Sequence, residues 1–126
     1  MEFFLTPDSH FVAIEINVRP PGGFSLDMMN FACDIDLCQW WAKLIAQNLD
    51  TPIYERKYHS AHACRRKGWH YRFDHNELLR RLGNTLAVHV HIPPAFSVAM
   101  GDEAYILRHP DLGALKEAIA WVEETA

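Results

Sequence analysis

The stretch 11–19, Phe-Val-Ala-Ile-Glu-Ile-Asn-Val-Arg, is strand-like, and from Ile14 onward its apolar side chains alternate with polar and charged ones. Because successive side chains of a strand point to opposite faces, Glu15, Asn17 and Arg19 are predicted to share one face. The other face carries valine and isoleucine. A Pro-Pro-Gly-Gly loop follows directly, at residues 20–23. A strand that presents an acid, an amide and a guanidinium beside such a loop indicates a site for a metal ion and an anion.

A second acid is predicted to face this strand across a hairpin. The segment Glu2–Thr6 is strand-like, and the Pro-Asp-Ser-His that follows is typical of a four-residue turn. If Thr6 pairs with Phe11 across this turn, Glu2 lies opposite Glu15. Cross-strand neighbours on one face lie close together, so the two carboxylates are predicted to be adjacent.

The chemistry of this pair favours a divalent cation. Like charges placed opposite each other are destabilising, and a cation between them would remove the repulsion. With the amide oxygen of Asn17, the carboxylates of Glu2 and Glu15 form an oxygen-only ligand set that suits Mg²⁺ or Mn²⁺. Such a site normally leaves positions open for water and substrate phosphate. The alternative is a surface hairpin whose polar face simply meets water, and the residues alone leave both interpretations open.

The same residues resemble the metal-binding end of ATP-grasp enzymes, in the branch that contains carbamoyl phosphate synthase and biotin carboxylase. The resemblance runs from Glu2 to about Asn48 and is carried by Glu15-Ile16-Asn17-Val18-Arg19, the glycine loop and the segment Asp34–Leu37. It implies an ATP-dependent carboxylate–amine ligase that uses Mg²⁺ and ATP to activate a carboxylate as an acyl phosphate.

The resemblance also implies roles for individual residues. Glu2, Glu15 and Asn17 would be the ligands of one or two Mg²⁺ ions that bridge the ATP phosphates. Arg19 would be the catalytic residue, in contact with the substrate carboxylate or the acyl phosphate. The implied cofactor-binding residues are Glu15, Asn17, Gly22 and Gly23.

The nucleotide-holding residues of ATP-grasp enzymes come earlier in the chain than the metal-binding strands. Since the match here begins at Glu2, the resemblance implies the C-terminal portion of a ligase, inactive in isolation. Residues 1–50 would be the end of the ATP-grasp domain, and residues 51–126 a small C-terminal α+β subdomain packed on it. Two alternatives remain: a non-enzymatic fragment that forms a homodimer, or a subunit of a split ligase that docks on a separate ATP-binding chain. Neither the acid nor the amine substrate is specified.

Length and composition are those of a small globular protein. The chain has 126 residues, of which 49% are hydrophobic and 22% charged. The net charge of −4 argues against nucleic-acid binding. No apolar run is long enough to span a membrane, and the N-terminus lacks the features of a signal peptide. Cys33, Cys38 and Cys64 follow no metal or disulfide spacing, so we expect reduced thiols and a cytoplasmic location.

Periodicity and turn signals predict an α+β fold with a mostly antiparallel sheet. Ser25 is expected to cap one helix, and Asp74 with Glu77 forms a capping box for another. Lys67-Gly68 is expected to be a hairpin turn between neighbouring strands. Beyond the first two strands, helices are predicted over 26–33, 36–49 and 75–82 and from about 111, and strands over 58–66, 69–73, 85–92, 96–100 and 103–109.

Two further groups of residues invite a functional interpretation. His89 and His91 lie two apart on a predicted strand and could share a metal, but two ligands are too few and no third is evident. Arg65 lies in a basic run beside the predicted hairpin turn, where it either meets solvent or helps to hold a carboxylate or phosphate.

Overall fold

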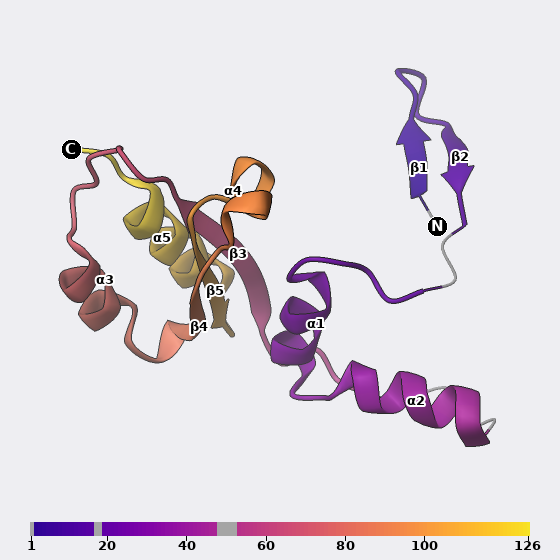
Figure 1. Ribbon diagram of the computed structural model, residues 1–126. Helices are drawn as coiled ribbons and strands as arrows, with labels where there is room; N and C mark the ends of the chain where they lie inside the picture. Colours follow the sequence, from indigo (N-terminus) through magenta and orange to yellow (C-terminus); the bar gives the residue numbers. More distant parts are fainter. Residues whose placement is uncertain (1, 17–18, 48–52) are drawn as a thin grey trace.

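The computed structural model describes residues 2–16, 19–47 and 53–126 (Figure 1). The predicted α+β class with antiparallel sheets is confirmed. Within the described residues, none of the helices has the length and apolar character needed to cross a bilayer. The elements in chain order are β1 Glu2–Leu5, β2 Phe11–Glu15, α1 Ser25–Cys33, α2 Leu37–Gln47, β3 His59–Arg65, α3 His75–Leu82, the 3-10 turn Gly83–Thr85, β4 Leu86–His91, α4 Pro94–Met100, β5 Glu103–His109 and α5 Leu112–Glu123.

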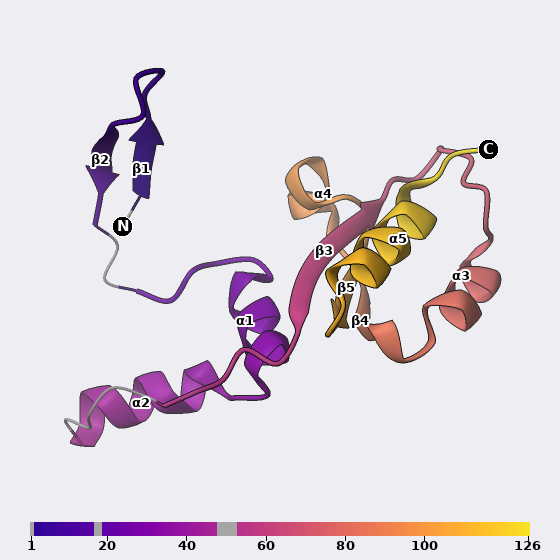
Figure 2. The ribbon, with the colours of Figure 1, turned by 180° about the vertical axis from the view of Figure 1, so that it is seen from behind.

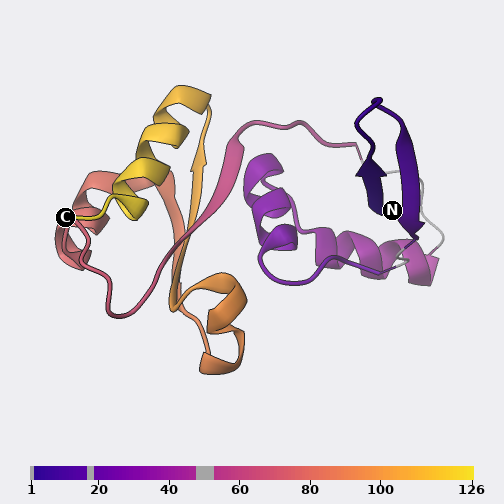
Figure 3. The ribbon, with the colours of Figure 1, turned by 90° about the horizontal axis from the view of Figure 1, so that it is seen from above.

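The larger sheet has three strands in the order β3-β5-β4. Both neighbouring pairs are antiparallel, so β3 and β4 run parallel, with α3 between them in the chain and β5 between them in the sheet. This is a split β-α-β arrangement. Helices α3 and α5 lie on one side of the sheet and α1 lies on the other (Figure 3).

The main core lies between this sheet and helices α3 and α5. Because β5 is central and covered on both faces, its residues from Ala104 to Leu107 have no exposed surface. Tyr105 and Leu107 point toward the two helices, where they join the buried cluster. The other members of that cluster are Ala63, Phe73, Leu78, Leu82, Leu115, Ala118 and Val122.

Local capping signals position the two helices that cover the core. The Asp74 side chain accepts a hydrogen bond of 2.8 Å from the backbone N–H of Glu77, and α3 begins at His75 as predicted. The Asp111 side chain accepts one of 2.7 Å from the N–H of Ala114 at the start of α5. Both helix starts are confirmed, because an Asp side chain can satisfy an otherwise unpaired backbone donor there.

Helix α1 is held to the other face of the sheet by Asp34, the residue that follows its last turn. Its carboxylate lies 2.6 Å from a guanidinium nitrogen of Arg108 and 3.3 Å from the Lys57 ammonium. The hydrogen bond from Arg108, followed by that from Lys57, holds the pKa of Asp34 below its ordinary value. At the other end of α1, the Phe24 ring stacks on the His62 ring of β3, with centroids 5.3 Å apart.

Three expectations about the start of α1 and the segment after β3 were wrong. Ser25 does not cap α1: Phe24 is the cap residue, and it makes no side-chain cap hydrogen bond. Residues 69–73 form no strand, and only an isolated bridge joins Tyr71 to Thr125. Lys67-Gly68 is therefore not a turn between paired strands, because β3 pairs with the distant strand β5.

The segment predicted as a strand over 96–100 is helical. Helix α4 has a proline in its first turn, where the fixed backbone angle and missing N–H of proline are tolerated. A short apolar run such as Phe-Ser-Val-Ala-Met does not distinguish a strand from a helix by itself. Helix α2 begins at Leu37, close to its predicted start, whereas its predicted end at Leu49 lies outside the described residues.

Candidate functional site

The first candidate site is the hairpin formed by β1 and β2, which stands clear of the helices and of the main sheet (Figures 1 and 2). Glu2 is the direct cross-strand partner of Glu15, so the predicted juxtaposition of these two acids is confirmed. Both residues are exposed. Two carboxylates on paired residues provide the hard oxygen ligands that Mg²⁺ prefers, so the donors of this pair fit that ion.

The register between the turn and this acidic pair differs from the prediction. Thr6 pairs with His10, and its backbone N–H donates to the His10 carbonyl over 2.9 Å. The loop therefore has three residues, and the last of them, Ser9, adopts a left-handed conformation with φ of 65°. Leu5 consequently faces Phe11, and a register irregularity next to Glu2 restores its pairing with Glu15.

This register distributes apolar side chains over both faces of the hairpin. A shift of one residue moves Phe3 and Leu5 to the face that carries Phe11 and Glu15. The Phe3 and Phe11 rings meet edge to face, with centroids 6.1 Å apart. Large apolar side chains remain exposed on both faces: Phe3, Phe4, Leu5, Phe11, Val12, Ile14 and Ile16.

The other sequence-predicted residues lie beyond the hairpin. Asn17 falls outside the described residues. Arg19 is exposed and lines an apolar groove of about 440 Å³ together with Trp40 and Trp41 of α2. Gly22 and Gly23 lie in the loop that leads into α1, where Gly23 has a φ of 63°. The structure therefore brings Glu2 and Glu15 together and places Arg19 at a neighbouring groove.

A second cluster of candidate functional side chains lies on the face of the larger sheet that α3 and α5 cover. Glu103 and Tyr105 are two apart on β5 and share a face. On β4, His91 is the cross-strand partner of Glu103 and His89 that of Tyr105. His75, the first residue of α3, completes the cluster. Three elements that are distant in sequence thus converge on one carboxylate.

Distances within this second cluster are short. The Tyr105 hydroxyl donates to Glu103 Oε2 over 2.8 Å. His89 Nε2 lies 3.6 Å from the same oxygen, and His75 Nδ1 lies 4.0 Å from it. His91 Nδ1 lies 3.6 Å from Glu103 Oε1. Rings of His75 and His89 are also packed together, with centroids 4.6 Å apart.

The electrostatic state of the cluster follows from its partial burial. Burial lowers the pKa of His89, and the neighbouring His75 lowers it further. Burial opposes ionisation of Glu103, but the hydrogen bond from Tyr105 and the histidines outweigh it, so the net pKa is lowered. Burial, followed by the hydrogen bond to Glu103, raises the pKa of Tyr105. At neutral pH the cluster therefore combines an anionic carboxylate with a neutral His89 imidazole.

Sequence reasoning found only part of this cluster. It paired His89 with His91 but found no third ligand, because Glu103 and His75 belong to other elements. The signal that was available is the acid two residues before Tyr105, on the strand predicted over 103–109. Antiparallel pairing of the strands predicted over 85–92 and 103–109 would have placed that acid beside the histidines.

Arg65 has neither of the roles considered for it. It is buried, and its guanidinium donates to the carbonyl oxygens of Val122, Phe73 and Trp121 over 2.8, 2.9 and 3.4 Å. Its plane lies over the Tyr71 ring, 4.5 Å from the centroid. Arg65 therefore satisfies carbonyl groups at the C-terminal end of α5, as basic side chains do at helix ends.

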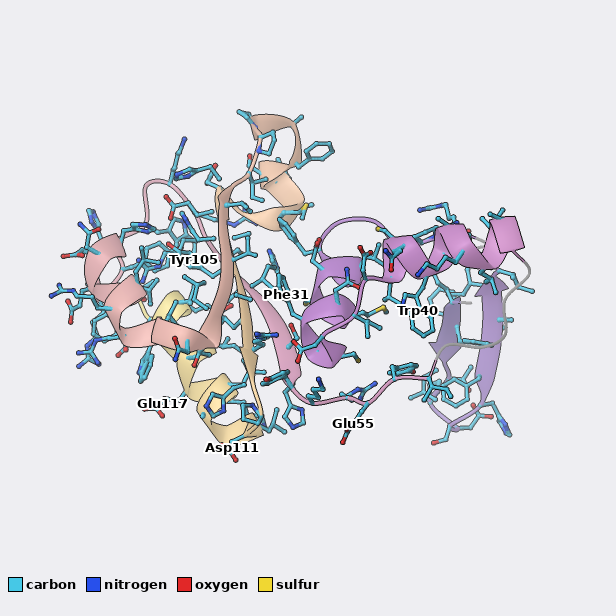
Figure 4. The ribbon with its side chains drawn as sticks, turned by 90° about the horizontal axis from the view of Figure 1, so that it is seen from below. Phe31, Trp40, Glu55, Tyr105, Asp111 and Glu117 are labelled. Carbon is cyan, nitrogen blue, oxygen red and sulfur yellow. The ribbon has the colours of Figure 1, made fainter. Side chains whose placement is uncertain are left out.

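The two candidate sites lie at opposite ends of the molecule. Tyr105 marks the second cluster, within the layer of α3 and the sheet, whereas Trp40 marks the groove beside α2 (Figure 4).

Comparison of the chain with protein-family models, with curated proteins and with solved structures finds no match in any of the three.

Proposed function

We propose that this chain supplies the cation-binding hairpin of an ATP-dependent ligase. Such a ligase activates a carboxylate as an acyl phosphate with Mg²⁺ and ATP, after which an amine or other nucleophile displaces phosphate. The observation that carries the proposal is the direct cross-strand pairing of Glu2 with Glu15. The likeness of residues 2–48 to the metal-binding end of ATP-grasp enzymes adds support and supplies the reaction class.

Under this proposal the residues of the hairpin and of the loop that follows it have three separate roles. Glu2, Glu15 and Asn17 hold Mg²⁺, which when bound would neutralise charge on the ATP phosphates. Arg19 presents two parallel N–H donors to a carboxylate or acyl phosphate. Gly22 and Gly23 leave the backbone of the following loop open to close approach by a substrate.

The proposal places the nucleotide clamp on a separate segment or chain. The apolar faces of the hairpin are the surface on which that part would dock, since exposed apolar surface of this extent marks interaction sites. The 126-residue chain alone is then expected to bind Mg²⁺–ATP weakly and to show no turnover.

The experiment that tests the cation site uses NMR amide signals as a local readout. Addition of Mn²⁺, which is paramagnetic, should broaden the signals of residues 2–5 and 11–16. The double variant Glu2→Gln/Glu15→Gln should abolish that broadening, whereas Asp8→Asn, which removes an exposed acid at the tip of the same hairpin, should preserve it. Signals that stay sharp in the hairpin of the unaltered chain would rule the site out.

Activity provides the second test, in a protein that also carries the nucleotide clamp. Substitution of Glu15→Ala or Asn17→Ala should abolish ligase turnover, because each removes a proposed metal ligand. Unchanged Mg²⁺–ATP binding and turnover would remove these residues from the site.

A second candidate is a non-enzymatic chain that forms a homodimer through the hairpin. The specific observation in its favour is the exposure of apolar side chains on both faces of β1 and β2. Two copies could cover each other there, by pairing strand edges or by stacking faces. The state of association in solution separates this candidate from a hairpin that waits for a different partner.

A further inference from the structure

We propose that His75, His89 and Glu103 form a binding site for a divalent transition-metal ion of the Zn²⁺ class. This site is independent of the proposed ligase function and lies in a different part of the molecule. Its ligands come from α3, β4 and β5, and the three candidate ligand atoms all lie within 4.8 Å of one another. Among the described residues, this is the group of three His, Cys, Asp or Glu side chains with that spacing.

The spacing of the ligand atoms fits a tetrahedral ion. Zinc–ligand bonds of about 2.0–2.1 Å imply ligand atoms about 3.3 Å apart in a tetrahedral site. The observed separations from Glu103 Oε2 are 3.6 Å to His89 and 4.0 Å to His75. These separations exceed the tetrahedral value by less than an ångström, which small side-chain rotations can supply. They also exceed hydrogen-bond length, so neither histidine is held to this oxygen by a hydrogen bond.

One atom of the cluster lacks the hydrogen bond that its burial demands. His89 Nε2 is buried, and among the described residues it has no hydrogen-bond partner. Buried polar atoms are normally satisfied, and an exception calls for an explanation such as an ion. A metal bound between His89 and Glu103 would give this nitrogen a partner, and the imidazole and the carboxylate would then coordinate the same ion.

The ligand types select the class of ion. Two imidazoles and one carboxylate suit Zn²⁺ and related transition metals, whereas Mg²⁺ and Ca²⁺ prefer oxygen alone. This set of three protein ligands leaves the fourth position of a tetrahedral ion to water. His75 and Glu103 are partly exposed, with 41% and 29% of their side-chain surface accessible, so water and ions can reach the site.

Tyr105 positions the carboxylate from outside the ligand set. Its hydroxyl donates to Glu103 Oε2, and its ring packs against the His89 ring with centroids 4.7 Å apart. Because Tyr105 is fully buried in the core, it fixes both ligands to the rigid part of the fold. Groups of this kind orient metal ligands and tune their affinity.

The test titrates the 126-residue chain with Zn²⁺ alone, in competition with a chromophoric chelator. We expect one Zn²⁺ per chain. His89→Gln and Glu103→Gln should each weaken binding by at least about tenfold, since the loss of an outer-shell partner alone already costs that much. His70→Gln, which removes an exposed histidine outside the cluster, is the matched control and should leave affinity unchanged. Equal losses in His70→Gln and His89→Gln would overturn the proposal.

A second readout starts from the unaltered chain, so it does not depend on whether the His89 and Glu103 variants fold. Co²⁺ added to the unaltered chain should give the intense visible bands of a low-coordinate ion, and Zn²⁺ should displace it. The double variant Glu2→Gln/Glu15→Gln should retain these bands, which separates this site from the hairpin. Absence of both Zn²⁺ binding and Co²⁺ bands in the unaltered chain would refute the site, as would loss of the bands in the hairpin variant.

Discussion

Tyr105 and Glu103 form a hydrogen bond of 2.8 Å in which a fully buried hydroxyl anchors a partly exposed carboxylate. The same hydroxyl lies 3.1 Å from His75 Nδ1. One core tyrosine therefore contacts two of the three proposed metal ligands, and a metal bound to His75 Nδ1 would replace the contact of that nitrogen with the hydroxyl. Glu103 and Tyr105 are two residues apart on the central strand, so both face α3.

Replacement of Tyr105→Phe should separate the positioning role of the hydroxyl from the packing role of the ring. Affinity for Zn²⁺ should fall about tenfold, since outer-shell partners typically contribute that much. The free energy of unfolding should fall by only about 1–2 kcal/mol, the usual value of one hydrogen bond. Competition titration and urea unfolding measure the two quantities, with Tyr54→Phe as an exposed control. An unchanged zinc affinity would show that the hydroxyl does not orient Glu103.

Arg65 should be among the most sensitive positions for stability. Arg65→Met keeps the apolar stem but leaves buried carbonyl oxygens, including those of Val122 and Phe73, without their donor. The expected loss is about 2–4 kcal/mol in the free energy of unfolding by urea. Arg65→Lys should recover only part of it, because one ammonium cannot reproduce the planar fork. Arg80→Met, on the exposed side of α3, should change stability by less than about 0.5 kcal/mol.

Gly101 lies where a side chain has no room. Its φ is 79°, and an added Cβ would lie 2.7 Å from Cys64 Cβ and 3.0 Å from the Arg65 carbonyl oxygen. Gly101→Ala should therefore lower the free energy of unfolding by about 2 kcal/mol or more, through both backbone strain and overpacking. Gly22→Ala is the matched control, since no atom of the other described residues beyond its chain neighbours lies within 4 Å of its added Cβ. Equal urea midpoints for the two variants would contradict this reading of Gly101.

Elements specified by neighbouring residues could be predicted from the sequence. The Asp74 and Glu77 pair predicts α3 with its observed bounds, and the strand predicted over 103–109 is β5 with its observed bounds. What failed was strand pairing. The hairpin expected at Lys67-Gly68 is local in sequence, whereas β3 pairs with a strand some forty residues away. That choice depends on which apolar faces can share one core, and local turn signals do not encode it.

The candidate sites differ in the same way between local and long-range pairing. Glu2 and Glu15 are joined by one short turn, so a local argument predicted their pairing, although the pairing in the structure depends on a register irregularity next to Glu2 that the argument did not include. The histidine cluster needs the β4–β5 register to bring Glu103 to His89, and it needs the packing of α3 to add His75. The sequence alone therefore did not predict that Glu103 and His75 lie beside His89.

His62, which lies on the α1 side of the sheet, should make the free energy of unfolding depend on pH. Burial lowers its pKa, while Glu123 opposes the shift. The unfolded chain then binds more protons than the folded chain below pH 6.5, so stability should fall as the pH drops from about 6.5 through the folded-state value. His62→Phe should show a smaller loss between pH 8 and pH 5 in urea unfolding, with His70→Gln as the exposed control. Parallel pH profiles for the unaltered chain and His62→Phe would exclude this contribution.

Association through the hairpin is the remaining expectation, and it rests on the exposed faces of β1 and β2. Phe4 and Ile14 share one face and are 64% and 48% exposed. If two copies cover this face, Phe4→Ser/Ile14→Ser should shift a concentration-dependent dimer to monomer in sedimentation velocity. Val98→Ser, which removes a single exposed apolar side chain on α4, should leave the dimer intact. If the unaltered chain is a monomer at every concentration, the homodimer is excluded. The hairpin would then be expected to bind a partner of different sequence, because exposed apolar patches mark interaction sites.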